Sequence, residues 1–281
     1  MLIFLISKAF LKTDRLALKK ENHNFHLVDP SPYPLLVSLF LFTTVISVVF
    51  RLSNDFYTSK VLLNITFPLF MFYFLSWFHD IIIESKYHHT FKVRHGLAYG
   101  MLLFIVSEVM FFFSFFWAFF NASISPAIQI GGIWPPKGLE TISFMGLPLL
   151  NTVILLLSGL SVTWAHKSIT NVSMFSETSF ALFFTVLLGN IFSLFQAEEY
   201  WSSPFSISDS VYGSTFFMAT GFHGFHVAIG AIILFICLIR HFLGHFTTTH
   251  HFGLIAAIWY WHFVDVVWIF LFVSMYWWGG H

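Results

Sequence analysis

The sequence predicts an all-α integral membrane protein that crosses the bilayer seven times. Of its 281 residues, 57% are hydrophobic and only 9% are Asp, Glu, Lys or Arg, whereas about a quarter of the residues in an ordinary soluble domain are charged. Phenylalanine alone contributes 40 residues. A lipid bilayer is the one solvent that accepts so much apolar surface without a large penalty for aggregation. The composition therefore excludes a soluble globular protein.

The second observation is a series of apolar stretches, each near the length of about 20 residues that a helix needs to cross about 30 Å of hydrocarbon. We expect the first to begin around Pro32 to Pro34, because proline is well accommodated in a first helical turn. Residues 121–146 contain several Pro and Gly residues and are predicted to be a long loop rather than a helix. The seven expected spans are residues 35–50, 61–83, 97–120, 147–165, 178–197, 211–240 and 253–277.

The third observation is the distribution of Lys and Arg between alternate loops. One side has only Arg51, Lys60 and Lys137 of the 13 basic residues, and the other side has the remaining ten. This bias predicts the N-terminus on the cytoplasm-equivalent side and the C-terminus opposite, and it supports an odd number of spans. The opposite face is expected to carry an acidic cluster of Glu198, Glu199 and Asp209. The ten residues on the positive side are Lys8, Lys12, Arg15, Lys19, Lys20, Lys86, Lys92, Arg94, Lys167 and Arg240.

Charge and sulfur content exclude several classes of site. The 13 basic and 13 acidic residues balance, which gives no argument for nucleic acid as a partner. Cys237 is the single cysteine, so the chain cannot form an internal disulfide. Cysteine-type structural zinc, iron–sulfur clusters and a dinuclear copper site bridged by two thiolates all need more sulfur. The sequence therefore excludes these sulfur-rich metal sites.

Glu108 is the first candidate for chemistry, because it lies near the middle of the third span. An ionisable group in the middle of a span costs about 2.5–3.5 kcal/mol on insertion scales, so a packing or functional role is expected for it. One reading is a protonated acid that hydrogen-bonds to a neighbouring helix and serves packing alone. The other is a group that titrates or contacts a polar moiety in a cleft. Either reading predicts that Glu108 faces the bundle or a lipid-filled cleft rather than the bulk bilayer.

The sixth span contains His223 and His226, three residues apart on one helix face. Two ligands are too few for a closed zinc site, and a bis-histidine haem would need histidines on facing helices. The favoured reading is therefore structural, with interior histidines that hydrogen-bond across the bundle. Gly221 and Gly224 support it, since small residues allow a neighbouring backbone to approach.

The last span repeats the same spacing with His262 and Asp265. An imidazole and a carboxylate one turn apart can satisfy each other inside the bundle, so we interpret this pair as structural too. Four more histidines are expected in the loop that precedes this span, either as solvated interfacial residues or as a surface that collects protons near neutral pH. They are His241, His245, His250 and His251.

Several long motifs in fixed order are similar to one family. They include HLVDPSPYP at 26–34, HGLAYGMLLFIVSEVMFFFSFFWAFF at 95–120, GGIWPPKG at 131–138, PLLNTVILLLSGLSVTWAH at 148–166, LFQAEEYWSSPFSIS at 194–208, ISDSVYGSTFFMATGFHGFHVAIG at 207–230 and HHFGLIAAIWYWHFVDVVWIFLFVSMYWW at 250–278. Together they resemble subunit III of cytochrome c oxidase. The resemblance covers residues 26–279, and a quinol oxidase subunit is the nearest alternative, although such subunits generally lack the two N-terminal spans.

The resemblance implies a subunit without haem or copper of its own, packed on the catalytic subunit I of a proton-pumping terminal oxidase that takes electrons from cytochrome c. It implies a mitochondrial inner membrane location with the N-terminus in the matrix, or else a bacterial plasma membrane. It further implies phospholipids in a cleft between helices 1–2 and helices 3–7. Lipid-binding positions carried over by motif are Glu84, His89, Trp117 and Arg240, and Glu108 is carried over as a proton-related position in the cleft.

One corner departs from the family pattern. A basic residue usually precedes the acid that ends the second helix, but here Ile83 precedes Glu84. Lys86, about one turn onward, is a candidate to supply the missing positive charge.

The N-terminal residues 1–25 form a separate extension before the seven-span domain of residues 26–281. A basic stripe of Lys8, Lys12, Arg15 and Lys19 beside an apolar face predicts an amphipathic helix in the headgroup plane. The alternative is a disordered or cleaved leader. As rivals to the oxidase subunit, a free-standing transporter and an independent haem enzyme remain to be distinguished by co-purification and by an absorption spectrum.

Overall fold

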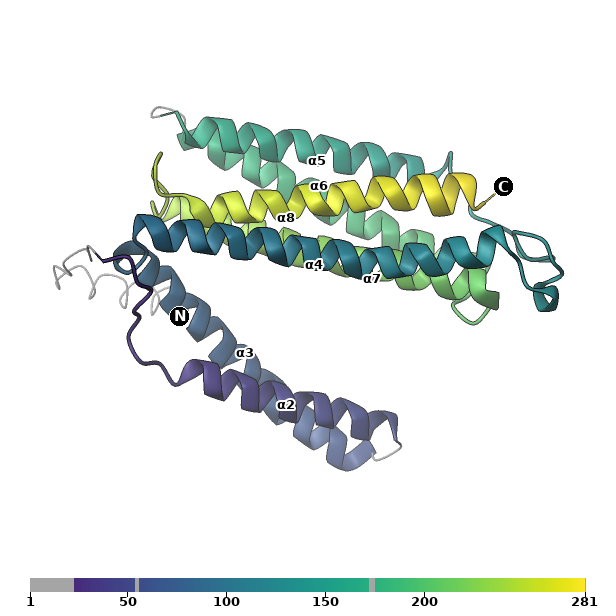
Figure 1. Ribbon diagram of the computed structural model, residues 1–281, viewed down its shortest axis with the longest axis horizontal. Coiled ribbons are helices and arrows are strands. Elements are labelled where there is room, and N and C mark those ends of the chain that lie inside the picture. Colours follow the sequence, from purple (N-terminus) through teal and green to yellow (C-terminus); the bar gives the residue numbers. More distant parts are fainter. Residues whose placement is uncertain (1–22, 54–55, 172–174, 281) are drawn as a thin grey trace. The chain divides into compact units, whose positions relative to one another are not determined.

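The computed structural model describes residues 23–53, 56–171 and 175–280, without the side chains of residues 56–58 and 86–87. The predicted amphipathic helix at the N-terminus and the side chain of Lys86 lie outside these described parts. Within them every regular element is a helix, and there is no strand. Seven helices are long and apolar enough to cross a membrane, which confirms the predicted fold class. They form two compact units, residues 1–97 and 98–281, and the helices are labelled in Figure 1.

The first unit is built on α2 (Tyr33–Leu52) and α3 (Phe56–Tyr87), which pack against each other. Pro32 occupies the N-cap of α2, as expected from its fixed φ angle. The buried positions of α2 are Val37, Thr44 and Ser47, which repeat at helical spacing along one face. Across this contact the ring of Phe40 stacks on Tyr73, with centroids 5.2 Å apart.

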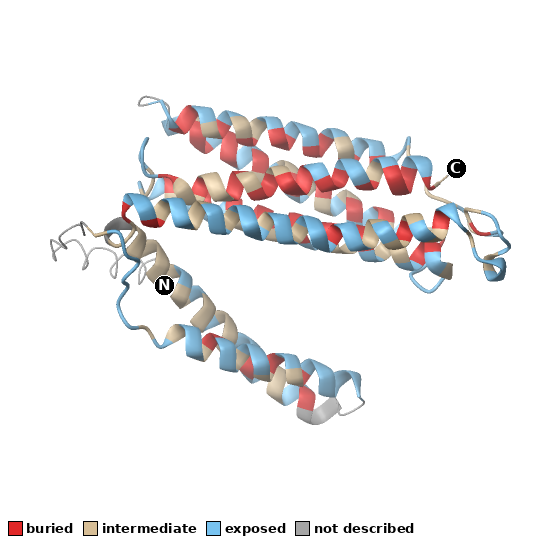
Figure 2. Ribbon diagram, in the orientation of Figure 1, coloured by how far each residue is buried: buried red, intermediate tan, exposed pale blue. Residues whose placement is uncertain are grey.

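The second unit contains most of α4 (Phe91–Ile124), followed by α5 (Leu147–Ile169), α6 (Phe175–Ser202), α7 (Ser210–Phe242) and α8 (Phe252–Leu271). A π-helical segment, η2 (Phe272–Trp278), continues α8. Helix α5 packs against α6 and α8, and α7 packs against α6 and α8. Of the seven spans α8 is the most deeply buried, and Figure 2 shows buried positions along much of its length.

Trp261 of α8 ties four helices of this unit together. Its indole is fully buried, and its Nε1 donates a hydrogen bond of 2.9 Å to the Ser158 hydroxyl of α5. The benzenoid ring lies so close to two glycines that a Cβ would meet it at 2.6 Å from Gly189 of α6 and at 2.9 Å from Gly230 of α7. Both glycines therefore make room for one side chain.

The glycines expected to allow close helix approach are different ones, and that expectation is wrong. Among the described residues, a Cβ at Gly224 would meet nothing within 4 Å, and one at Gly221 would reach only the Tyr200 hydroxyl at 3.9 Å. A glycine in a membrane helix therefore does not by itself show which helix packs beside it or which side chain fills the space.

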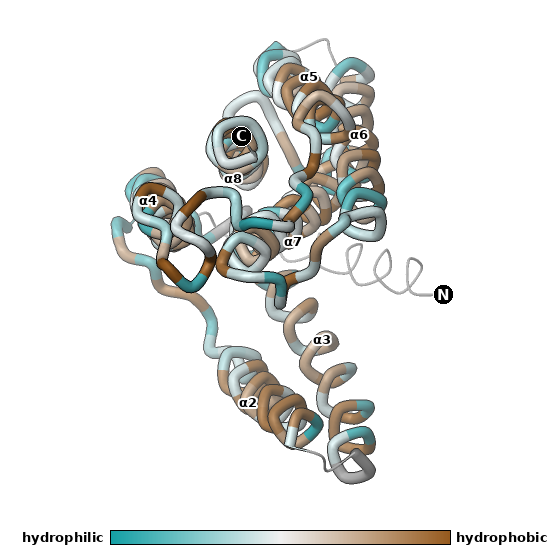
Figure 3. The backbone as a smooth tube through the Cα atoms, turned by 90° about the vertical axis from the view of Figure 1, so that its right-hand side faces the viewer, coloured by the Kyte–Doolittle hydropathy of each residue, from teal (hydrophilic) through white to brown (hydrophobic). Residues whose placement is uncertain are grey.

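The observed helices extend beyond the predicted apolar spans. Helix α4 begins at Phe91 and continues through Asn121 to Ile124, so the predicted loop starts later than expected, and a 3₁₀ turn occupies Ile128–Ile130. Figure 3 shows hydrophilic residues near helix ends and hydrophobic ones along the middle of the spans. The helices continue because backbone hydrogen bonding does not stop where the hydrocarbon does.

Candidate functional site

Glu108 of α4 and His226 of α7 form a pair inside the second unit. The Glu108 Oε2 lies 2.9 Å from the His226 Nε2. The side chains of Glu108 and His226 are only 21% and 9% exposed, so neither group is left bare toward acyl chains. The pair joins two helices through residues 118 positions apart in the sequence.

A second contact defines the chemistry of this pair. The His226 Nδ1 lies 2.6 Å from the backbone carbonyl oxygen of Phe222, and a carbonyl can only accept, so Nδ1 must carry hydrogen. In a neutral imidazole Nε2 is then an acceptor and Glu108 donates as a carboxylic acid; in a charged imidazolium Nε2 donates to the carboxylate. In both states a single proton lies between Glu108 and His226.

Aromatic rings surround the imidazole of His226 and restrict its access to water. Phe111 and Phe112 come from α4, and Tyr260 and Phe263 come from α8, with ring centroids 5.1–6.3 Å from that of His226. Electrostatic interactions strengthen where water is excluded. The arrangement can therefore hold one proton in a defined place and exchange it when a donor or acceptor reaches the pair.

His223 lies on the same helix as His226 but contacts different neighbours. Its ring is fully buried against Phe192 of α6 and Trp268 of α8. Its Nε2 lies 3.3 Å from the carbonyl oxygen of Val264. The two histidines thus do not converge on one point. Across the described residues there is no group of three or more His, Cys, Asp or Glu side chains that could hold a metal ion.

His262 and Asp265 lie close together on α8, with the His262 Nδ1 3.6 Å from the Asp265 Oδ2. The His262 Nε2 is 3.3 Å from the Thr163 hydroxyl of α5. Asp265 is buried, and a Cβ at Gly159 of α5 would stand 2.7 Å from its Oδ2. The pair therefore joins α8 to α5.

The four positions implied for lipid binding are divided between the units. Glu84 lies in α3 and His89 at the corner between α3 and α4, within the first unit; Trp117 of α4 and Arg240 of α7 belong to the second unit. Trp117 is 61% exposed. The guanidinium carbon of Arg240 lies 4.6 Å from the centre of the Phe246 ring, and its buried Nε has no hydrogen-bond partner in the described parts of the chain. A guanidinium with a free donor fits a phosphate headgroup.

Two of the four histidines expected in a solvated loop are buried, which corrects that expectation. His241 belongs to α7, where its ring stacks on Phe175 at 4.3 Å and its Nε2 lies 3.1 Å from the Phe175 carbonyl oxygen. His251 precedes α8, with Nδ1 2.9 Å from the Thr247 carbonyl oxygen. Helix α7 continues past the apolar stretch, so His241 packs rather than facing water.

His89 lies between two spans, beside His26. The two ring centroids are 5.5 Å apart. Burial lowers the pKa of His89 below its ordinary value of 6.5, and the positive charge of His26, His88 and Arg94 lowers the pKa further. The folded chain therefore favours the neutral imidazole, which can still donate one hydrogen bond.

This shift predicts a loss of stability in mild acid. Because the pKa of His89 is lower in the folded than in the unfolded chain, the unfolded chain binds more protons as the pH falls below about 6.5, and stability falls with it. We expect His89→Gln to reduce the drop in thermal unfolding temperature of the complex between neutral and mildly acidic pH. His95→Gln, at an exposed position on the following helix, is the control, and an equal change in both variants would contradict the prediction.

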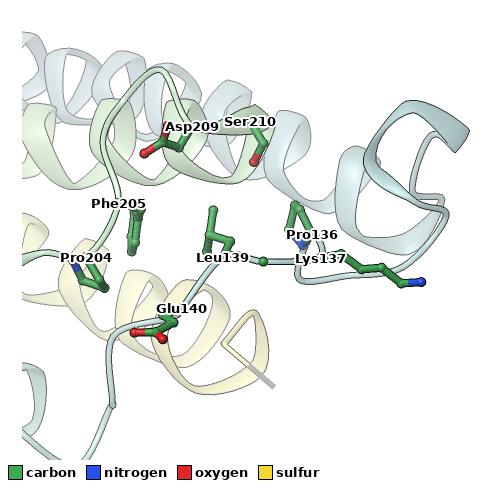
Figure 4. Close-up of a pocket in the computed structure, with 9 residues that line it drawn as sticks. Pro136, Lys137, Leu139, Glu140, Pro204, Phe205, Asp209 and Ser210 are labelled. Carbon is green, nitrogen blue, oxygen red and sulfur yellow. The ribbon is translucent and has the colours of Figure 1, made fainter.

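A pocket of about 370 Å³ opens at the start of α7, between residues 136–140 and 204–210. Its lining mixes Lys137 with Glu140 and Asp209, as Figure 4 shows. The Asp209 carboxylate accepts hydrogen bonds from the Ser206 backbone N–H and hydroxyl. The pocket contains none of the expected site residues.

Sequence reasoning also missed a buried carboxyl. Glu199 was expected beyond the end of a span, in an acidic cluster on the opposite face, but it belongs to α6 and is only 2% exposed. The spacing of Gln196 and Glu199, one helical turn apart, is the signal that could have revealed it. The partner of Glu108 carried no such local signal, because it lies on a distant helix.

Comparison with known proteins places the chain in a family. The family model described as cytochrome c oxidase subunit III matches residues 23–280. The chain belongs to the cytochrome c oxidase subunit III family. It is 55% identical to cytochrome c oxidase subunit 3 of Marchantia polymorpha over 93% of this chain and 98% of that protein. The same-named protein of Arabidopsis thaliana is 53% identical over 94% and 99%, and that of Drosophila yakuba is 53% identical over 92% and 98%.

Membership of the cytochrome c oxidase subunit III family confirms the resemblance seen in the motifs. It makes the chain a multi-pass membrane subunit of an oxidase complex, with other oxidase subunits as its partners. The family match begins at residue 23, so the expected N-terminal helix is outside both the match and the described residues.

Proposed function

We propose that this chain is a non-catalytic core subunit of cytochrome c oxidase in the mitochondrial inner membrane. In this proposal it stabilises the catalytic subunit I, and haem and copper are held by partner subunits, where oxygen is reduced with electrons from cytochrome c. Family membership and the high identity to plant and insect relatives support the proposal. The scarcity of sulfur supports the absence of redox centres here, and the excess of Lys and Arg supports an N-terminus in the matrix.

The observation that carries the proton-related part of the proposal is the 2.9 Å contact between Glu108 and His226. With Nδ1 committed to the Phe222 carbonyl, the pair holds one proton within the membrane. A residue pair that shares one proton can accept it from one neighbouring group and pass it to another. We infer that this pair supports proton uptake by the complex rather than the chemistry of oxygen reduction.

The lipid part of the proposal is supported by the character of the four implied side chains. Arg240 offers an unpaired guanidinium donor suited to phosphate, and the exposed ring of Trp117 suits acyl chains and the headgroup boundary. Glu84 and the neutral His89 suit polar headgroup atoms. We propose that phospholipids bind at these four positions, with Glu84 and His89 contacting lipid in the first unit and Trp117 and Arg240 in the second.

A hydrophobic carbodiimide should label Glu108 selectively in the assembled complex, because the carboxyl is reached from an apolar medium and holds a proton with His226. Glu108→Gln is expected to abolish the label, whereas the exposed Glu198 should remain unlabelled in the wild type. The variant should keep its haem absorbance and initial rate of electron transfer, and fail instead in proton uptake or over many turnovers. Labelling confined to other carboxylates, or haem loss without loss of assembly, would contradict the proposal.

Purification in mild detergent distinguishes the oxidase subunit from the rival hypothesis of a free-standing transporter. An oxidase subunit should migrate with haem-bearing partners and have no activity alone. Transport by the purified chain in vesicles would favour the rival reading.

A further inference from the structure

Glu199 is a second carboxyl buried within the bundle, in the last turns of α6. Glu199 is 2% exposed, Gln196 is 4% exposed and Tyr276 of η2 is 1% exposed. The Tyr276 hydroxyl donates a hydrogen bond of 2.6 Å to the Glu199 Oε1. The Gln196 Nε2 donates to the same oxygen at 3.2 Å. Two nearly inaccessible donors therefore converge on one oxygen of this carboxyl.

The other oxygens of this cluster lack partners. Neither the Glu199 Oε2 nor the Gln196 Oε1 has a hydrogen-bond partner among the residues that the structure describes. No Lys, Arg or His side chain in the described ranges forms an ion pair with Glu199. The cluster thus contains two orphaned oxygens, both on side chains more than nine-tenths buried.

The balance of donors and acceptors argues against an ionised Glu199. A buried carboxylate without a counter-ion is costly, and two neutral donors on one oxygen leave the second oxygen unsatisfied. A protonated Oε2 becomes a donor, while the Gln196 Oε1 remains an acceptor. A water molecule accepts from the first and donates to the second, which satisfies both orphaned atoms.

We propose that Glu199 is held as a neutral acid and that, with Gln196, it binds a buried water molecule. The π-helical geometry of η2 contributes, because this segment positions Tyr276 against Glu199; π-turns inside α-helices frequently occur at functional sites. Phe216 and Trp268 pack around the Tyr276 ring at centroid distances of 5.1 and 5.7 Å. The site is separate from the Glu108–His226 pair and does not depend on the proposed role of that pair.

The test compares infrared spectra of the purified complex. The spectrum of wild type minus Glu199→Gln is expected to show one carbonyl band of a protonated carboxyl, which shifts in D₂O. Glu198→Gln is the matched control, because Glu198 is adjacent but exposed, and it should leave that band in place. A difference spectrum with carboxylate bands and no protonated carbonyl would overturn the neutral acid.

Two further measurements test the proposal if the Glu199→Gln variant fails to assemble. Gln196→Met removes the proposed water acceptor together with the Nε2 donor to the Glu199 Oε1 but keeps the carboxyl, so the same band should move to higher wavenumber. A map of the wild-type complex that resolves ordered water should show density within hydrogen-bond distance of the Glu199 Oε2 and the Gln196 Oε1. An unchanged band in Gln196→Met, or a water-resolving map with no density there, would overturn the water site.

Discussion

Replacing Gly189 or Gly230 by valine should prevent the complex from accumulating, and alanine should destabilise it measurably. A Cβ at either position would stand within 3 Å of the Trp261 ring, and this ring cannot move away because it is fully buried and its Nε1 is bonded to Ser158. Inserting carbon into a packed interior costs about 1–3 kcal/mol per position. We expect each alanine variant to lower the thermal unfolding temperature of the purified complex, and the double variant to lower it further.

Gly224→Ala is the matched control on the same helix as Gly230. No atom in the part of the chain that the structure describes lies within 4 Å of a Cβ there, and alanine has the higher helix propensity in water, so we expect little loss. A second check is rescue: Trp261→Leu alone leaves a cavity, and large-to-small changes of this kind cost several kcal/mol, about 3–5 for Trp→Ala. Because Gly189→Ala partly fills that space, the combined loss should be smaller than the sum.

Equal losses for Gly224→Ala and Gly230→Ala would show that the general cost of an added methyl group, rather than contact with Trp261, dominates. Strict additivity of Gly189→Ala and Trp261→Leu would show that the two residues do not share one space.

The sequence predicted the number and order of the spans because hydrophobicity alone specifies them. It placed their ends too far inside: the third stretch was predicted from residue 97, whereas α4 begins at Phe91 and includes Lys92, Arg94 and His95 in its first turns. Polar residues lower the hydropathy of a window without ending a helix. For the same reason, His241 and Glu199 were placed outside the spans, in a loop and in an acidic cluster of the opposite face.

Side-chain partners could not be predicted in the same way. Helical spacing puts His223 and His226 on one face of α7, but it cannot say that His226 meets α4 while His223 meets α6 and α8. Local spacing did bring His262 and Asp265 together, because both lie on one helix. Contacts within a helix follow from periodicity, whereas contacts between helices depend on packing that a single sequence does not encode locally.

The Glu108–His226 pair predicts different outcomes for two substitutions of one residue. Glu108→Leu leaves the His226 Nε2 without a partner in a site walled by aromatic rings, which should cost about 1–3 kcal/mol. Glu108→Gln should cost much less, because its amide can donate to an Nε2 that is free to accept while Nδ1 remains bonded to the Phe222 carbonyl. The measurement is the thermal unfolding temperature of the complex.

A double-mutant cycle then isolates the pair from its surroundings. His226→Leu alone strands the carboxyl of Glu108, so it should be as harmful as Glu108→Leu. Once either partner is gone, removing the other relieves an unsatisfied polar group, so the double leucine variant should be clearly more stable than the sum of the single losses predicts. Additive losses, or a Gln variant as unstable as the Leu variant, would mean that the 2.9 Å contact does not hold the two helices together and that Glu108 is satisfied by another group in the assembled complex.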